Sequence, residues 1–339
     1  MATFSKRNID KDDIKKIIVS RTDNLGDVIL TLPLITQIKK NYPNATVTFL
    51  VKKYVYNLIK DYPGIDEFVY IDDLNNSSKL RKFFKQENFD LMFNVYPRFE
   101  IALAAFFARI KIRVGTGYRW YSYLFNKRNH EHRKTAEKHE AVYNLNLLKT
   151  VIHNKEDFPI EFNFKVSDEE ISKLSEKLKS KIDINSDYII IHVPSKGSAA
   201  KLPGAKFIEY INAFNSEFKN VKVIFTGVEE ERTEIESVIN DVKEKNNLIN
   251  LCGELSLSEL KTLISKSILF VSNSTGPVHI AGALNKNIIG FYPHLLPANK
   301  NRWRPLSKNV VIFEPEIDDE MGTIRIDEVM KATRNLLKS

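Results

Sequence analysis

The chain has 339 residues, of which 43% are hydrophobic and 11% aromatic, so it can bury a sizeable core over a length typical of two domains. Its 51 Lys and Arg against 43 Asp and Glu give a formal net charge of +8, which fits an anionic substrate, an anionic membrane surface or simple solubility. The single cysteine, Cys252, excludes an intramolecular disulfide and a Cys-rich zinc site, and it favours a reducing cytoplasm.

The N-terminal residues 1–16 are charged and lack the apolar core of a signal peptide. The longest apolar stretch, residues 101–110, is far below the roughly 20 residues needed to cross a bilayer. We expect this stretch to form a buried helix.

Strand-like and helix-like segments alternate along both halves of the chain. Runs of β-branched and aromatic residues predict strands at 15–20, 45–52, 67–72, 91–95 and 111–115, and again at 188–193, 221–227, 247–253, 267–272 and 287–293. Helical periodicity predicts helices at 77–89, 204–215, 229–245 and 256–267, the last with a capping box at Ser256 and Glu259. This βαβ rhythm predicts parallel sheets covered by helices in two domains, 1–165 and 166–339, joined by a linker within 155–185.

The first predicted strand leads into the sequence RTDNLGDVILTLP at residues 21–33. Gly26 lets the backbone approach a ligand closely, and Pro33 predicts an interrupted helix. Asp27 fits two roles, a general base that takes a proton from an attacking hydroxyl or a residue that caps the next helix.

The sequence HVPSKGSAAKLPGAKF at residues 192–207 follows the first strand of the second half. Ser195 and Lys201 precede a helix expected to begin near Pro203, and a lysine beside a Gly/Ser loop can bind phosphate. The spacing is not that of a Walker loop, and solvated surface lysines are the alternative.

The sequence VSNSTGPVHIAGALNK at residues 271–286 places a strand end before a helix that Pro277 can begin. Ser274 or Thr275 is the candidate cap, and Gly276 follows. A helix N-terminus with nearby hydroxyls can bind a diphosphate, and an ordinary capped helix is the alternative.

Residues 113–138 mix basic and aromatic side chains, a composition compatible with nucleic acid, an acidic glycolipid or a membrane surface. His130, His132 and His139 lack the accompanying ligands of a known metal-site spacing, so we expect no metal site.

Three of these motifs, in this order, resemble the glycosyltransferase family 9, the lipopolysaccharide heptosyltransferases. They are SRTDNLGDVILTLPLITQIKKNYP, SKGSAAKLPGAKF and LCGELSLSELKTLISKSILFVSNSTGPVHIAGALNKNIIGFYP. The resemblance implies the α/β GT-B fold, with two Rossmann-like parallel-sheet domains facing a cleft. It also implies an inverting transfer without metal or cofactor, from a nucleoside-diphosphate sugar such as ADP-heptose to a lipopolysaccharide core or related glycolipid.

The resemblance also implies roles for individual residues. Asp27 would be the base. Glu231 would contact the ribose of the donor, by an alignment that also admits Glu229 and Glu230. The other contacts with the donor would be made by Lys201, Ser195, Ser274, Thr275, Gly276, Pro277 and His279. The acceptor would meet Gly26, Arg98, Arg119, Arg133 and His139. Many members have an aspartate where this sequence has Ser274, so donor choice can differ at that position.

The expected setting is the cytoplasm, and peripheral contact with the inner membrane is compatible with it. A nucleotide-sugar epimerase or hydrolase of similar fold is the alternative enzyme. A basic nucleic-acid-binding protein is the non-enzymatic alternative, although no standard nucleic-acid module is present and we expect no nucleic-acid partner.

Overall fold

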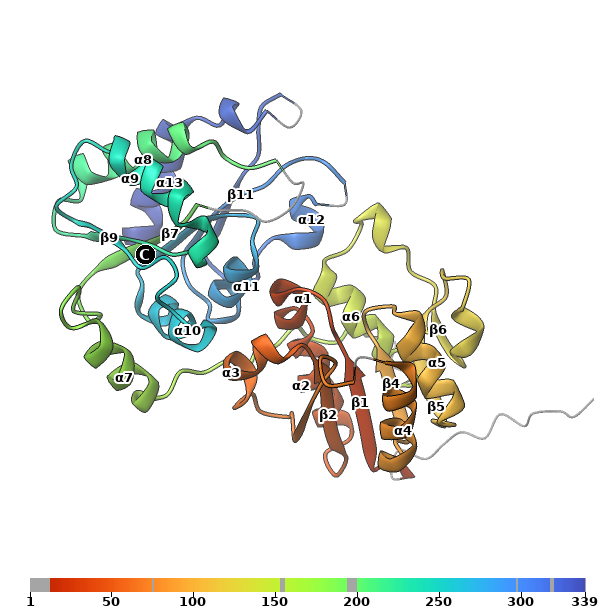
Figure 1. Cartoon of the computed structure of the whole chain (residues 1–339). Coiled ribbons are helices and arrows are strands. Elements are labelled where there is room, and N and C mark those ends of the chain that lie inside the picture. The colour runs from red at the N-terminus through yellow and green to blue at the C-terminus, as the bar shows by residue number, and fades with distance from the viewer. Residues whose placement is uncertain are drawn as a thin grey trace, which may run out of the picture. The chain divides into compact units, whose positions relative to one another are not determined.

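The computed structural model describes residues 13–74, 76–152, 156–193, 200–296, 298–317 and 320–338. The chain divides into two compact units. The first comprises Met1–His132 with Ala141–Asn163, and the second comprises Arg133–Glu140 with Phe164–Ser339. Each unit contains one parallel sheet, labelled by element in Figure 1.

The sheet of the first unit has six strands among the described residues, in the order β3-β2-β1-β4-β5-β6. The strands are β1 (Lys16–Ser20), β2 (Thr46–Val51), β3 (Glu67–Tyr70), β4 (Leu91–Asn94), β5 (Ile112–Thr116) and β6 (Lys127–Asn129). All neighbouring pairs are parallel, and Ser20 at the end of β1 pairs in register with Leu50 and Asn94. The strand order reverses between β1 and β4, and such a switch point is where open α/β sheets bind ligands.

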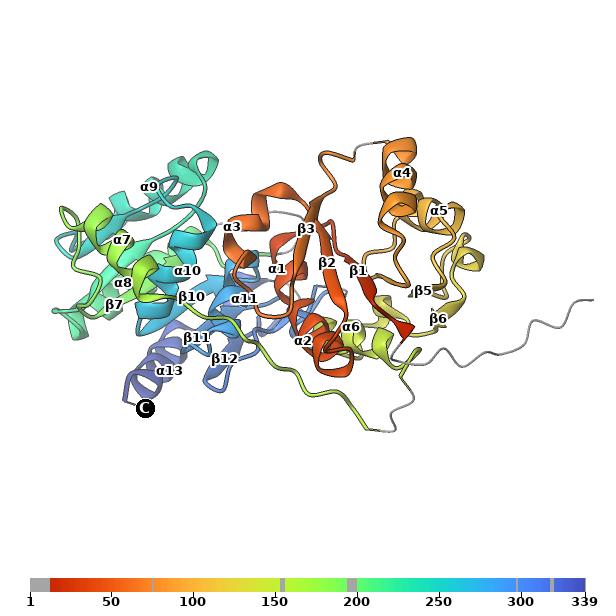
Figure 2. The ribbon, with the colours of Figure 1, turned by 90° about the horizontal axis from the view of Figure 1, so that it is seen from below.

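The helices of this half are α1 (Leu25–Ile29), α2 (Leu32–Asn41), α3 (Tyr56–Ile59), α4 (Ser77–Glu87), α5 (Phe99–Phe107) and α6 (Glu140–Leu148). Helices α4 and α5 contact each other, as Figure 2 shows, and they bury Ile18, Leu50 and Met92 on one face of the sheet. The predicted interruption near Pro33 is confirmed, because α1 ends at Ile29 and α2 begins at Leu32.

The second unit has a six-stranded parallel sheet among its described residues, in the order β12-β11-β10-β7-β8-β9. Its strands are β7 (Tyr188–His192), β8 (Lys222–Phe225), β9 (Leu248–Asn250), β10 (Leu269–Asn273), β11 (Ile288–Phe291) and β12 (Val310–Phe313). Its helices are α7 (Asp168–Leu178), α8 (Gly204–Glu217), α9 (Arg232–Asp241), α10 (Leu257–Lys266), α11 (Gly276–Ala283), α12 (Lys300–Trp303) and α13 (Ile326–Lys338). Here β7 and β10 flank the switch point.

The predicted fold class is confirmed, and every predicted strand is present. Two strands were not predicted, β6 and β12. The helix expected at 229–245 is shorter, because residues 229–231 form a 3-10 turn and the chain leaves α9 at Val242 in an extended conformation.

The prediction of a buried helix at 101–110 is correct only in part. Ile101, Ala104 and Ala105 of α5 are buried, whereas Phe106 and Phe107 are exposed, because one side of this apolar helix faces outward. None of the helices within the described ranges is long and apolar enough to span a membrane.

Candidate active site

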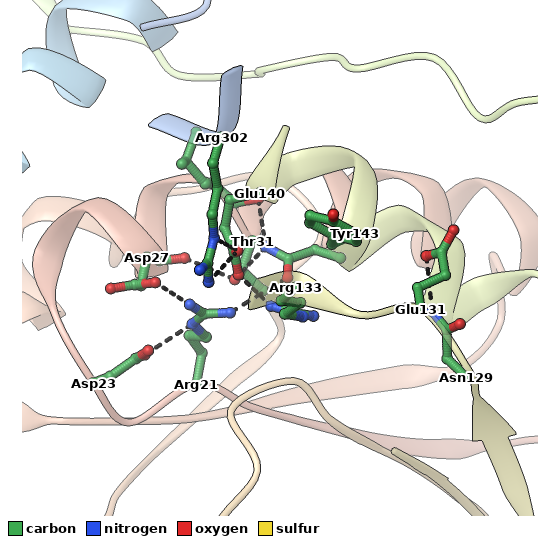
Figure 3. A network of polar contacts seen from close by, with 12 residues as sticks. Arg21, Asp23, Asp27, Thr31, Asn129, Glu131, Arg133, Glu140, Tyr143 and Arg302 are labelled. Atoms are coloured by element: carbon green, nitrogen blue, oxygen red, sulfur yellow. Dashed lines mark hydrogen bonds and ion pairs between the residues drawn. The ribbon is translucent and has the colours of Figure 1, made fainter. Parts of the chain in front are cut away.

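The first candidate site lies where β1 ends and α1 begins. Arg21 follows β1 directly, and its buried guanidinium pairs with two carboxylates: Nε donates to Asp23 Oδ1 at 2.8 Å, and Nη2 donates to Asp27 Oδ1 (Figure 3). The remaining donor, Nη1, reaches Asn144 Oδ1 at 3.3 Å. One arginine therefore holds two acidic side chains beside the switch point of the first sheet.

The backbone that carries Asp27 is also fixed. Thr31 Oγ1 donates to the Asp27 carbonyl at 2.8 Å, and Asn144 Nδ2 donates to the Leu30 carbonyl at 2.9 Å. The N-cap of α1 is Asn24, and the Asp27 carboxylate pairs with Arg21. Asp27 thus lies in the first turn of α1, as the alternative of a carboxylate at the helix start expects, but it does not cap the helix.

The two carboxylates differ in their surroundings. Burial raises the pKa of Asp23 to about 6, the attraction of Arg21 opposes this rise, and the neighbouring charge of Asp27 adds to it. Asp23 therefore titrates near pH 6. When Asp23 is ionised, it neutralises part of the positive charge of Arg21 that also faces Asp27. When Asp23 is protonated, it does not.

Buried polar atoms without a partner line the same end of the sheet. Ser20 Oγ, Thr22 Oγ1 and Asn94 Oδ1 are buried and have no hydrogen-bond partner among the described residues. Ser20 and Asn94 are opposite each other at the ends of β1 and β4. Because buried polar groups are normally paired, these atoms indicate a place for a bound water or a ligand hydroxyl.

The second candidate site is the turn between β10 and α11 in the second unit. Thr275 is the N-cap of α11, but its side chain does not cap the helix, and its Oγ1 lies 2.9 Å from Ser272 Oγ. Pro277 stands in the first turn. The first amides of α11 are thus left uncapped by this side chain and can meet an anion.

Asn273 joins this turn to the loop that follows β7. Its Nδ2 donates to the Val193 carbonyl at 2.7 Å, and its Oδ1 accepts from the Leu202 amide at 2.8 Å. The side chain of Asn273 is buried. The side-chain amide of Asn273 therefore connects the chain after β7 with the chain after β10, at the switch point of the second sheet.

The buried side chains of Tyr292 and His279 lie close to this turn in sequence or by hydrogen bonding. Ser274 forms a side-chain hydrogen bond with Tyr292, whose hydroxyl donates to the Trp303 carbonyl at 3.0 Å. Burial lowers the pKa of His279 to about 3, with a smaller effect in the same direction from His139. The His279 imidazole is therefore neutral at pH 7, and its Nδ1 has no partner among the described residues.

The other residues predicted for the donor lie on other elements of the second unit or outside the described residues. Lys201 is exposed, and its Nζ lies 2.6 Å from Glu234 Oε1. Glu231 Oε2 accepts from the Val228 amide at 2.9 Å. Ser195 lies outside the described residues.

The residues predicted for the acceptor are divided between the units. Gly26 is buried in α1, Arg98 precedes α5, and exposed Arg119 lies between β5 and β6, all in the first unit. Arg133 and His139 belong to the segment Arg133–Glu140, which is part of the second unit.

Buried contacts hold this segment within the second unit. The His139 Nε2 donates to the Arg304 carbonyl at 2.8 Å, and burial lowers the pKa of His139 to about 4. Buried Glu140 pairs with Arg133 and also accepts from Arg302 Nε at 2.9 Å (Figure 3). Nothing in the sequence pattern indicates that residues 133–140 contact the C-terminal half.

Sequence reasoning missed Arg21, Asp23, Asn144, Asn273 and Tyr292. Arg21, Asp23 and Asn273 lie at or just after strand ends, which is the signal that could have found them. In the described ranges, no group of three or more His, Cys, Asp or Glu side chains is arranged to hold a metal ion.

The comparisons with known proteins agree with one another. The sequence model of glycosyltransferase family 9 (heptosyltransferase) matches residues 77–331. A putative glycosyltransferase of Haemophilus influenzae is 28% identical, covering 94% of this chain and 95% of the relative. Lipopolysaccharide heptosyltransferase 3 of Escherichia coli K12 is 23% identical, covering 92% and 95%.

Among solved structures, the ADP-heptose lipopolysaccharide heptosyltransferase II of E. coli superposes with a TM-score of 0.81 at 18% identity, covering 96% of this chain and 99% of that one. This similarity shows the fold. Because the family model covers most of the sequence, the chain belongs to glycosyltransferase family 9, the heptosyltransferase family.

Proposed function

We propose that this glycosyltransferase moves heptose from ADP-heptose to a hydroxyl of a lipopolysaccharide core or related glycolipid, at the cytoplasmic face of the inner membrane. This choice of substrates is supported by the activities named for two similar proteins, a lipopolysaccharide heptosyltransferase and an ADP-heptose lipopolysaccharide heptosyltransferase. The observation that carries the chemistry is the Asp27 carboxylate, held by Arg21 at the switch point of the first sheet.

In the proposed reaction, the Asp27 carboxylate takes the proton of the acceptor hydroxyl, and that oxygen attacks the anomeric carbon of the donor. The bond between this carbon and the diphosphate oxygen breaks, and its electron pair leaves with ADP. A single displacement inverts the anomeric configuration. The charge of Arg21, which Asp27 shares with Asp23, opposes the arrival of that proton.

The second unit would bind the diphosphate and stabilise its growing charge. The first amides of α11, the hydroxyls of Ser274 and Thr275 and the ammonium of Lys201 supply donors without a proton transfer. Lys201 would exchange its exposed partner Glu234 for phosphate, at small cost because exposed ion pairs contribute little. Ser274 stands where many members of the family have an aspartate, and its side chain forms a hydrogen bond with Tyr292. This replacement would influence which sugar donor the protein binds.

The donor is tested by thermal unfolding with ADP-heptose and with GDP-, UDP- and CDP-sugars. At a concentration of 100 times its Kd, a ligand stabilises the folded state by about 2.7 kcal/mol, so the true donor should raise Tm most. EDTA should leave the shift unchanged, since the proposed reaction uses no metal. A larger shift with another nucleotide would replace ADP-heptose in the proposal, and no shift with any of them would contradict it.

The raised pKa of Asp23 predicts a pH dependence. Below about pH 6 Asp23 is neutral and the full charge of Arg21 faces Asp27, whereas above it ionised Asp23 shares that charge. The full charge of Arg21 opposes the transfer of a proton to Asp27, so kcat/KM for transfer should rise as pH increases through 6. In Asp23→Asn this step should be absent and the rate should stay at the low plateau. A rate profile of Asp23→Asn that keeps the step at pH 6 would contradict this account.

A further inference from the structure

Helix α5 in the first unit has an apolar side that faces outward. Phe99, Leu103, Phe106 and Phe107 follow the spacing i, i+4, i+7 and i+8, which places them on one stripe of the helix. Phe106 is 41% exposed and Phe107 49% exposed, and the single charged residue within α5 is Glu100. A surface helix normally places charged residues on this side.

The loop between β5 and β6 extends this apolar side. Trp120 is 73% exposed, and its ring centroid lies 4.8 Å from that of Phe99 at the start of α5. Tyr123, in the 3-10 turn Ser122–Leu124, is 61% exposed. We call Phe99, Leu103, Phe106, Phe107, Trp120 and Tyr123 the aromatic face.

The exposed side chains of this loop rest on a fixed backbone. Tyr121, Leu124 and Phe125 are buried against α5. Ser122 Oγ donates to the Thr116 carbonyl at 2.7 Å. Trp120 and Tyr123 are therefore exposed although the loop that carries them is packed against the protein. Their neighbours in sequence hold the loop in place.

The surroundings of the aromatic face are basic. Residues 98–128 contain seven Arg and Lys side chains and one acidic side chain, Glu100, whereas the whole chain has 51 basic and 43 acidic residues. The guanidinium groups of Arg113 and Arg81 lie 5.3 and 5.1 Å from the ring centroids of Phe106 and Phe107. Cations and exposed rings thus occupy the same surface.

We infer that the aromatic face is a docking surface for a bilayer that contains anionic lipids. Trp, Tyr and Phe partition to the boundary between headgroups and acyl chains, and nearby Lys and Arg side chains are attracted to an anionic surface. A contiguous apolar patch bordered by charges marks an interaction site, and the excess of positive charge selects an anionic partner. The adjacent exposed side chains of Phe106 and Phe107 suit acyl chains better than stacked bases, whereas Leu103 is half-buried and packs against the cluster that contains Tyr121, Leu124 and Phe125.

This inference deepens the proposed glycolipid acceptor and rests on it for the identity of the membrane. Binding to plain lipid is nevertheless a separate property. A test with vesicles that contain neither donor nor acceptor can fail while sugar transfer succeeds, and the reverse also holds.

The chain offers a direct reporter, since its two tryptophans are Trp120 and Trp303. In the full-length Trp303→Phe variant, Trp120 is the sole tryptophan. With vesicles of phosphatidylcholine containing 30% phosphatidylglycerol at low salt, its emission should shift to the blue and be quenched by brominated acyl chains. Vesicles of phosphatidylcholine alone should give a much smaller shift, and added salt should reverse binding.

Co-sedimentation of variants with the same vesicles tests the surface without fluorescence. Trp120→Ser with Tyr123→Ser should weaken vesicle binding about tenfold or more, since two large apolar side chains no longer enter the interface. Tyr54→Ser is the matched control, because Tyr54 is 50% exposed in the same unit but outside the aromatic face, and it should bind as the unchanged protein does. Circular dichroism confirms that each variant is folded.

Three results would overturn the inference. They are no vesicle binding by the unchanged chain, equal binding by the double variant and the control, or a Trp120 emission that responds to a DNA or RNA oligonucleotide and not to vesicles. Self-association abolished by the double variant, without any vesicle binding, would assign the aromatic face to a second copy of the chain.

Discussion

Replacing Asp27 with asparagine is expected to lower kcat for heptose transfer by about 10²- to 10⁴-fold, the usual contribution of a general base. The amide has nearly the same shape as the carboxylate but cannot accept the acceptor's proton. Arg21 keeps Asp23 as a carboxylate partner, so the variant should fold. Initial rates of ADP release at saturating donor and acceptor give the measurement.

Asp23→Asn is the matched control for this experiment. It removes the other carboxylate from the same guanidinium and should change the rate at pH 7 only a few-fold. A folded Asp27→Asn protein with near-normal transfer would remove Asp27 as the base. An equal loss in the two variants would assign the effect to the charge balance around Arg21 instead.

Asn273→Leu is expected to lower the free energy of unfolding of the second unit by about 2 to 6 kcal/mol. The substitution leaves the buried Leu202 amide and Val193 carbonyl without their partner, at about 1 to 3 kcal/mol each. Urea unfolding, followed by circular dichroism, measures this loss. Because Asn273 joins the loops after β7 and β10, ADP should also bind more weakly under conditions in which the variant is folded.

Asn309→Leu provides the comparison within the same unit. Asn309 is exposed, and its Nδ2 donates to Asn287 Oδ1 at 2.9 Å, so the change should lie within about 0.5 kcal/mol. If Asn273→Leu were no less stable than Asn309→Leu and bound ADP normally, Asn273 would have no role in setting the two loops.

The central strands of the sheets, such as β7 and β10, could be predicted because they are largely apolar runs that are buried on both faces. Strand β6 could not, since its sequence, Lys-Arg-Asn, has no strand pattern and pairs only because β5 offers an open edge. Helix α7 escaped prediction within the charged segment 153–187, although Ser167 and Glu170 form a capping box at its start.

The loops that form the candidate sites could be predicted from the sequence. The hydrogen-bond partners of the residues in these loops could not. The position of Asp27 after a strand and the helix that follows Thr275 are local patterns. The contact of Arg21 with Asn144 joins residues 123 positions apart, and no local pattern encodes it. The same limit applies to Asn273 and Leu202, which meet only because β7 and β10 pair.

Analysis of the reaction product tests the central claim most directly. The purified chain, ADP-heptose and a lipopolysaccharide core acceptor that lacks the added heptose should give one new glycosidic bond and one ADP per transfer. Mass spectrometry measures the added sugar, and NMR of the anomeric proton gives its configuration, which we expect to be inverted relative to the donor. ADP release that needs no acceptor, an epimerised donor or a product with retained configuration would contradict the account.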